Sequence, residues 1–218
     1  LSPSAGTGTI WSVRRARAEH LLGHSPHAEE ILTFYAALIE AQESIADAVP
    51  ASDWLSLVRS DIGVFPWLNL ERLPLQEFAL PFRDFLSKVV ELGNETTQDG
   101  ARDLLACEEG LRLESLRGTL DAWGQTDPHD FYARAFLEPV VLSIARESSI
   151  QPPDWTQNFC FTCATPPQVA VLQDLPDALG HRSLTCSICA TEWRFQRLTC
   201  PHCGETEADS PGPAESWG

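Results

Sequence analysis

The sequence predicts an α-helical domain followed by a small cysteine-rich β module. Apolar residues recur at the three- and four-residue spacing of helices over residues 11–149, and the run QPPD at residues 151–154 interrupts this pattern. Three CxxC pairs follow among short β-type runs. A chain of 218 residues can bury one sizeable core and a small module besides. We expect a helical domain over 1–153, a first metal-binding module over 154–199, and an incomplete second module with a tail over 200–218.

The clearest helix signal covers residues 26–49. Ser25 and Pro26 suit a helix start, because a side-chain oxygen can accept from free backbone N–H groups and proline presets φ. One face then carries the apolar residues Ile31, Phe34, Tyr35, Leu38, Ile39, Ile45 and Val49. Pro139 falls inside the last predicted helix and should kink it locally. Weaker patterns predict helices over 13–22, 53–58, 81–93, 99–106, 111–123 and 127–145, with an irregular connection over 63–74.

The apolar period changes after residue 154. Short β-type runs at residues 168–173, 182–186 and 193–199 are separated by turn residues. They predict a small antiparallel sheet.

The acidic charge of the chain is unevenly distributed. The formal net charge is −16; residues 1–159 carry 24 acidic and 12 basic side chains, whereas residues 160–204 carry three of each. Nucleic-acid binding draws most of its non-specific affinity from Lys and Arg that neutralise phosphates. The charge pattern therefore disfavours a DNA or RNA partner.

No stretch approaches the roughly 18 consecutive apolar residues of a membrane helix, and the start lacks the pattern of a signal peptide. We therefore expect a cytoplasmic protein without membrane insertion. Because the chain begins at Leu1 and contains no Met, we also expect a fragment or a trimmed product.

The chemistry of the chain is concentrated in its CxxC pairs. The first two pairs, separated by 22 residues, supply Cys160, Cys163, Cys186 and Cys189. A two-residue spacing lets both thiolates of a tight turn bind one ion, and two such turns complete a tetrahedral sulfur site. This pattern predicts a zinc-ribbon or rubredoxin-like module that holds Fe or Zn, because a four-sulfur cage suits both metals.

Disulfides and redox catalysis are the alternatives for clustered cysteines. Structural disulfides need an oxidising compartment, and no export signal is present. A thioredoxin-like motif needs one CxxC at a strand-to-helix turn, whereas here three pairs lie among β-type runs. No catalytic triad, phosphate-binding glycine loop or distinct carboxylate pair is visible either, so we do not expect an enzyme.

The third pair, Cys200 and Cys203, leaves a counting problem, because six cysteines make one tetrahedral site and half of another. We interpret this pair as the first half of a second metal site whose other ligands are missing. A homodimer could share such a second cage between two chains.

The region around these pairs resembles the formate dehydrogenase accessory protein FdhE family. The resemblance rests on the run FCFTCATPPQ from Phe159 and on the run GHRSLTCSICATEWRFQRLTCPHCG from Gly180. The upstream runs RAEHLL from Arg17 and HAEEILTFY from His27 resemble the family's helical domain, so the likeness covers about residues 11–209.

The resemblance implies a cytoplasmic factor that is needed for active, molybdenum-containing formate dehydrogenase. Our leading hypothesis is that such a factor binds the catalytic subunit of that enzyme. It also implies two rubredoxin-like sites built from four CxxC motifs. The first site would contain the first two pairs, and Cys200 and Cys203 would begin the second. The chain lacks a fourth CxxC, which would make it a C-terminally truncated member.

We further expect a docking surface beside the metal cage, because Trp and Arg dominate interface hot spots. The predicted docking residues are Thr191, Glu192, Trp193, Arg194 and Arg197, although Trp193 could equally form the core of the module. The alternative functions are a nucleic-acid-binding zinc ribbon, which would need a basic face, and a thiol or iron redox protein.

Overall fold

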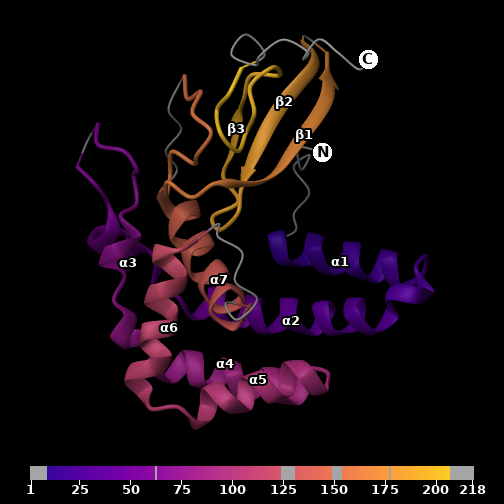
Figure 1. The fold of residues 1–218 in the computed structure, drawn as a ribbon, viewed down its shortest axis with the longest axis vertical. Coiled ribbons are helices and arrows are strands. Elements are labelled where there is room, and N and C mark those ends of the chain that lie inside the picture. The colour runs from indigo at the N-terminus through magenta and orange to yellow at the C-terminus, as the bar shows by residue number, and fades with distance from the viewer. Residues whose placement is uncertain (1–8, 62, 124–130, 149–153, 177, 207–218) are drawn as a thin grey trace, which may run out of the picture. The chain divides into compact units, whose positions relative to one another are not determined.

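The structure is a computed structural model, and it describes residues 9–61, 63–123, 131–148, 154–176 and 178–206. Within these residues the helices come first and the strands last (Figure 1). The helices are α1 (Ile10–Leu22), α2 (Glu29–Ala48), α3 (Ala51–Val58), α4 (Ala79–Leu92), α5 (Glu95–Ala106), α6 (Glu109–Asp121) and α7 (Phe131–Ser148). Short 3-10 turns are η1 (Pro26–Ala28), η2 (Leu70–Arg72) and η3 (Leu75–Phe78). The strands are β1 (Pro167–Leu175), β2 (Ala178–Cys186) and β3 (Glu192–Arg194). The predicted fold class is confirmed.

Side-chain caps begin two of the helices, whereas the predicted cap Ser25 makes no capping hydrogen bond: Pro26 lies in η1, and α2 begins only at Glu29. Thr9 accepts from Ser12 N–H at the start of α1, and Asn94 accepts from Thr97 N–H at the start of α5. Pro139 lies inside α7, as predicted. The predicted start of this helix at Asp127 and Pro128 lies outside the described residues, and so do residues 151–153 of the predicted interruption at 151–154.

The chain folds into two compact units that are not contiguous in sequence. The first unit comprises residues 1–50, 74–119 and 127–140, and the second comprises 51–73, 120–126 and 141–218. The predicted division near residue 153 follows chain order. Each compact unit includes segments of the predicted helical domain, and the division at residue 153 stays a prediction.

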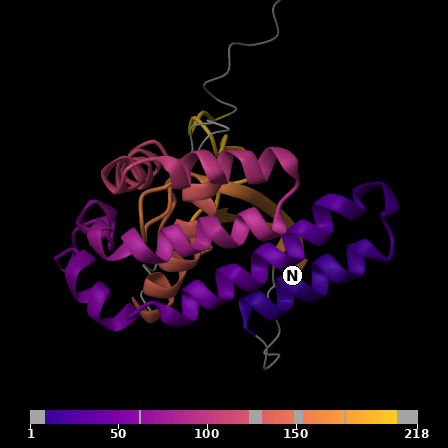
Figure 2. The same cartoon turned by 90° about the horizontal axis from the view of Figure 1, so that it is seen from below.

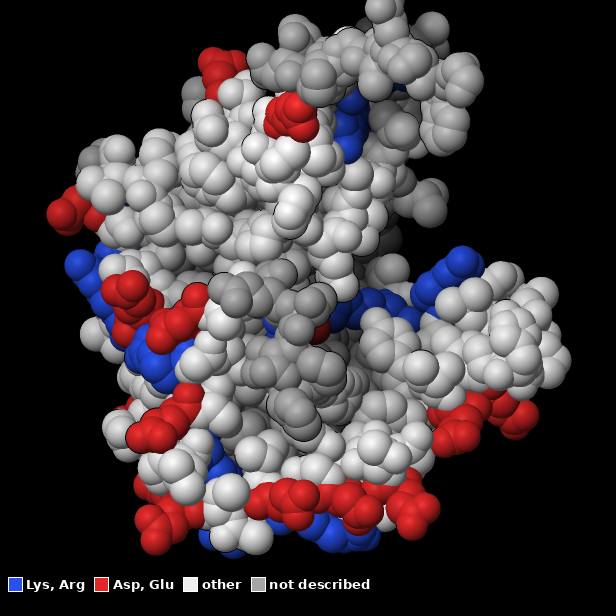
Figure 3. Space-filling view, viewed as in Figure 1, with Lys and Arg blue, Asp and Glu red and all other residues white. Residues whose placement is uncertain are grey.

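The first unit is built from two helical hairpins, α1 with α2 and α4 with α5 (Figure 2). Phe136 of α7 lies in its core, with ring centroids 5.7, 5.1 and 5.9 Å from those of Phe78, Phe82 and Phe85. The buried Gln42 side chain donates to the backbone oxygen of Ala135 at 2.9 Å. Acidic side chains gather along α4 and α5 (Figure 3). Within the described residues, no helix has the length and apolarity needed to cross a membrane.

The second unit contains a three-stranded antiparallel sheet in the order β1-β2-β3. β3 is shorter than the predicted run 193–199. Arg182 Nη1 donates to the backbone oxygens of Gln196, Arg197 and Thr199, at 3.2, 3.1 and 2.9 Å. Because these carbonyl groups accept hydrogen bonds from a guanidinium group, the strand does not continue through them.

Candidate metal centre

Each CxxC pair lies in a tight loop with the same backbone arrangement, which we call a knuckle: the first is residues 160–165, the second 186–191 and the third 200–205. In the first knuckle, Cys160 N–H donates to Thr165 O at 2.9 Å and Ala164 N–H donates to Cys160 O at 2.8 Å. The first bond recurs in the second knuckle, where Cys186 N–H donates to Thr191 O at 2.9 Å.

The residue after the second cysteine of each knuckle has a left-handed backbone. Its φ is 62° at Ala164, 54° at Ala190 and 76° at Gly204. An L-residue other than glycine pays roughly 1–2 kcal/mol in this conformation. Two alanines therefore accept strain that the knuckle turn requires, which is the behaviour of a loop shaped for a ligand.

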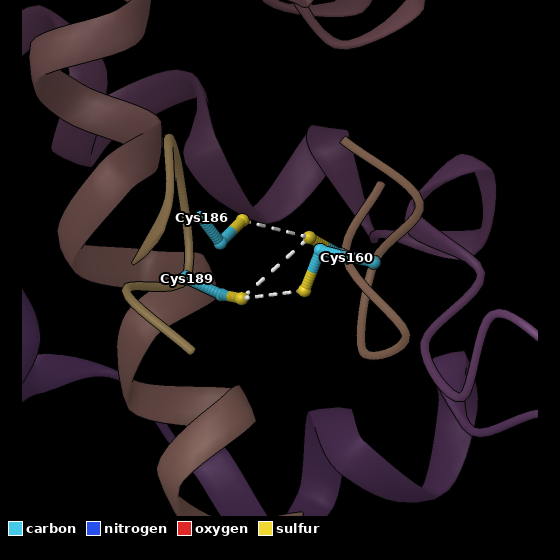
Figure 4. Close-up of side chains that lie close together, drawn as sticks. Cys160, Cys186 and Cys189 are labelled. Carbon is cyan, nitrogen blue, oxygen red and sulfur yellow. Dashed lines mark hydrogen bonds between the residues drawn. The ribbon is translucent and has the colours of Figure 1, made fainter. Parts of the chain in front are cut away.

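The first and second knuckles bring four sulfur atoms together. Cys160, Cys163, Cys186 and Cys189 are all buried, and their Sγ atoms lie within 4.8 Å of one another. The sulfurs point toward a common centre from the two knuckles (Figure 4). Three measured Sγ–Sγ distances are 3.6 Å for Cys160–Cys189, 3.5 Å for Cys163–Cys186 and 3.6 Å for Cys163–Cys189.

These distances fit a metal cage and do not fit disulfides. A tetrahedron with metal–sulfur bonds of about 2.3 Å has sulfur–sulfur edges of about 3.8 Å. A disulfide would place its sulfurs about 2.05 Å apart. We call the four cysteines the four-sulfur cage.

Hydrogen bonds to sulfur support the thiolate form of the cage. Thr165 Oγ1 lies 3.2 Å from Cys163 Sγ and 2.9 Å from Cys186 Sγ, and Thr191 Oγ1 lies 3.0 Å from Cys189 Sγ. In addition, a backbone N–H donates to the remaining sulfur, from Thr162 to Cys160 Sγ at 3.3 Å. Such donors spread the negative charge of a sulfur-ligated ion and orient its ligands.

Burial and mutual contact divide the four thiols into two classes. Burial is the main reason that the pKa of Cys163 is raised well above its ordinary value. The pKa of Cys189 is raised chiefly through its hydrogen bond with Cys160. Hydrogen bonds from neighbouring thiols lower the pKa of Cys160, first from Cys163, and the pKa of Cys186, first from Cys160. A cation that binds here must therefore displace protons.

The cage is supported by segments that sequence reasoning assigned to the helical domain. Trp67 N–H donates to Phe161 O at 3.1 Å, and Leu68 N–H donates to Thr162 O at 2.7 Å, so this segment pairs with the first knuckle. Trp123 Nε1 donates to Ser187 Oγ of the second knuckle at 2.9 Å. These contacts join distant parts of the chain, which is why sequence reasoning missed them.

The third knuckle is formed but stands apart from the cage. Cys200 N–H donates to Glu205 O at 2.7 Å, and Gly204 N–H donates to Cys200 O at 2.9 Å. Cys200 is partly exposed and Cys203 is exposed. Within the described part of the chain, the four-sulfur cage is the one group of at least three potential ligands placed to share an ion.

The five predicted docking residues differ in their surroundings. Trp193 is 5% exposed, and its Nε1 donates to Gln157 O at 3.0 Å, so it packs inside the module. Thr191 contacts the cage, as described above. Glu192, Arg194 and Arg197 have exposed side chains.

Known proteins resemble this chain over the segment that contains the four-sulfur cage. The family model "FdhE, central domain" matches residues 159–197, which contain the whole four-sulfur cage. The chain is 27% identical over 190 residues to the FdhE homologue of Aquifex aeolicus, covering 85% of this chain and 67% of the relative. It is 28% identical over 214 residues to the homologue of Pectobacterium carotovorum, covering 93% of this chain and 67% of the relative.

The crystal structure of the FdhE protein from Pseudomonas aeruginosa has the same fold. The TM-score is 0.56 at 19% sequence identity, and the match covers 93% of this chain and 73% of the other. The chain is therefore similar to FdhE proteins: residues 159–197 match the central domain of that family, related sequences align over most of the chain, and the fold is shared with a solved FdhE protein.

Proposed function

We propose that the chain is a metal-binding maturation factor for formate dehydrogenase, which binds the catalytic subunit of that enzyme in the cytoplasm. The observation that carries the proposal is the buried four-sulfur cage within the segment that matches the FdhE central domain. Four protein ligands close the coordination sphere of a tetrahedral ion and leave no position for a substrate. The cage therefore suits a structural metal, and the chain acts as an accessory protein rather than as an enzyme.

The metal would be Fe or Zn, since both accept four thiolates. Its part in the function is to hold the first and second knuckles together. β3 follows the second knuckle directly, so a bound ion would also fix the segment that carries Glu192, Arg194 and Arg197. This exposed part of the predicted docking set is our proposed contact with the catalytic subunit, while Thr191 and Trp193 maintain its shape.

Co-purification tests the proposal. The metal-loaded chain, expressed beside a formate dehydrogenase catalytic subunit, should retain that subunit and should not retain RNA or DNA. Cys189→Ser should abolish retention because it removes one ligand of the cage. Arg194→Ala should weaken retention at unchanged metal content, whereas Arg72→Ala, at an exposed arginine of η2 in the same unit, should not.

Two outcomes would contradict the proposal. One is a metal-loaded chain that fails to retain the catalytic subunit at low salt. The other is retention of nucleic acid with a steep salt dependence, which would favour a nucleic-acid-binding zinc ribbon.

A further inference from the structure

The second unit holds a cavity of about 640 Å³ that follows β3, separate from the four-sulfur cage. Its walls come from residues 154–156, Phe161, residues 179–182 and residues 192–197. The volume lies in the range of ligand-binding pockets, about 300–1,000 Å³. The cavity can therefore accept part of a partner molecule.

The side of β3 that faces away from β2 has unpaired backbone groups. Thr191 O accepts from Cys186 N–H, and Phe195 N–H donates to Arg182 O at 2.9 Å, so alternate residues of this segment bond to β2. In an antiparallel pair the residues between them, Glu192 and Arg194, direct their N–H and C=O groups outward. Within the described residues, neither backbone has a hydrogen-bond partner on that side.

Three arginines line the same cavity. Arg182, Arg194 and Arg197 take part in none of the ion pairs among the described residues. Two carboxylates, Asp154 and Glu192, also line it, but neither lies within ion-pair distance of these guanidinium groups.

One of the three guanidinium groups is held over the β2 backbone. Gly180 has a φ of 62°, and a Cβ placed there would lie 2.4 Å from Arg197 Nη1. The absence of a side chain at Gly180 lets Arg197 approach this closely. On a chain of net charge −16, this concentration of arginines in one cavity is a local exception.

We propose that β3 and this cavity bind an extended acidic segment of a protein partner, which adds to the sheet as a fourth strand. The backbone groups of Glu192 and Arg194 would pair with the segment, as in other cases of strand addition to an open sheet edge. Arg194 and Arg197 would bind its carboxylates, and charge-assisted hydrogen bonds of this kind are the strong ones. The inference rests on the proposed function for the identity of the partner, a formate dehydrogenase catalytic subunit.

The binding mode is testable without that subunit. A fluorescein-labelled nonapeptide of alternating glutamate and valine should bind the metal-loaded chain at least about tenfold more tightly than the glutamine-valine version. Arg194→Glu with Arg197→Glu should lower the affinity by at least about tenfold, and Arg194→Gln with Arg197→Gln by less. The matched control is Arg59→Glu with Arg72→Glu, two exposed arginines of the same unit outside the cavity, which should bind like the unsubstituted chain.

N-methylation of the peptide tests strand addition itself. Only alternate amides of an added strand donate to the sheet edge. Methylation of these amides should abolish binding, whereas methylation of the amides between them, which point away from the edge, should not. Equal effects at all positions, or equal affinity for the glutamate and glutamine peptides, would overturn the inference. Each variant is compared at equal metal content, so that a loss of folding is recognised.

The same variants separate this inference from the proposed function. If the Arg194→Glu, Arg197→Glu chain still captures the catalytic subunit, the maturation role stands and the acidic-strand inference is wrong. If the acidic peptide binds with the predicted alternation but the subunit is not captured, the inference stands and the proposed function is wrong.

Discussion

Leu68→Ala distinguishes a metal module made of residues 154–218 alone from one that includes residues 51–73. Leu68 is 1% exposed, and its N–H donates to Thr162 O of the first knuckle at 2.7 Å. It lies far from the cysteines in sequence. A module confined to the last third of the chain would not respond to this substitution.

The expected magnitude follows from burial. Replacement of a buried leucine by alanine costs about 2–5 kcal/mol. Because metal binding and folding of such a small unit are coupled, this loss appears in the apparent affinity for the metal. At about 1.4 kcal/mol per factor of ten, the affinity should fall by up to about 30- to 4,000-fold.

Competition with a chromophoric chelator for one zinc ion measures this change. The matched control is Leu86→Ala in α4, because Leu86 is also fully buried but belongs to the first unit. We expect Leu86→Ala to lower the thermal stability of the helices and to leave zinc affinity within a few-fold of the unsubstituted chain. A Leu68→Ala chain that binds zinc as tightly as the Leu86→Ala chain would refute the reasoning.

Four further predictions follow from the cage. Cys160→Ser or Cys189→Ser should release the ion and unfold the second unit, and persistence of most far-UV helical signal checks the independence of the first. Because Cys200 and Cys203 supply only two ligands, titration should find one tight ion per chain, and two tight ions in a monomer would contradict this. Thr165→Val removes a hydroxyl that lies within hydrogen-bond distance of two sulfurs and should weaken metal binding about 10- to 100-fold, whereas Thr165→Ser should retain it. Calorimetry in buffers of different ionisation enthalpy should detect proton release when the ion binds, because Cys163 and Cys189 have a raised pKa. The affinity should therefore fall as the pH falls, and a pH-independent affinity would contradict this.

The helices and the cage ligands were predictable because each leaves a local pattern. The stripe that includes Leu38 and Ile39 predicts α2, and both residues are buried. Two-residue spacing of cysteines predicts knuckles that can share an ion, and the structure brings the first two pairs together.

The hydroxyl donors of the cage also have a sequence signal. The run Cys-Ala-Thr occurs at residues 163–165 and again at 189–191, so equivalent positions of two knuckles carry the same side chain. The third knuckle has Gly204 and Glu205 instead. There a carboxylate oxygen lies 4.0 Å from Cys203 Sγ, where the other knuckles place a hydroxyl.

Hydrogen bonds between segments that are distant in sequence could not be predicted in the same way. The bonds from Trp67 and Leu68 to the first knuckle use backbone N–H groups, which every residue except proline carries. The end of β3 likewise depends on a guanidinium from β2, 14 residues away from Gln196. Neither interaction requires a particular residue type at a fixed spacing, so neither leaves a pattern in the sequence.

X-ray absorption of the metal-loaded chain tests the central claim most directly. The extended X-ray absorption fine structure at the iron or zinc edge should show four sulfur neighbours at about 2.3 Å and no nitrogen or oxygen in the first coordination shell. A first shell that mixes sulfur with nitrogen or oxygen at one ion per chain would contradict the four-sulfur cage formed by Cys160, Cys163, Cys186 and Cys189.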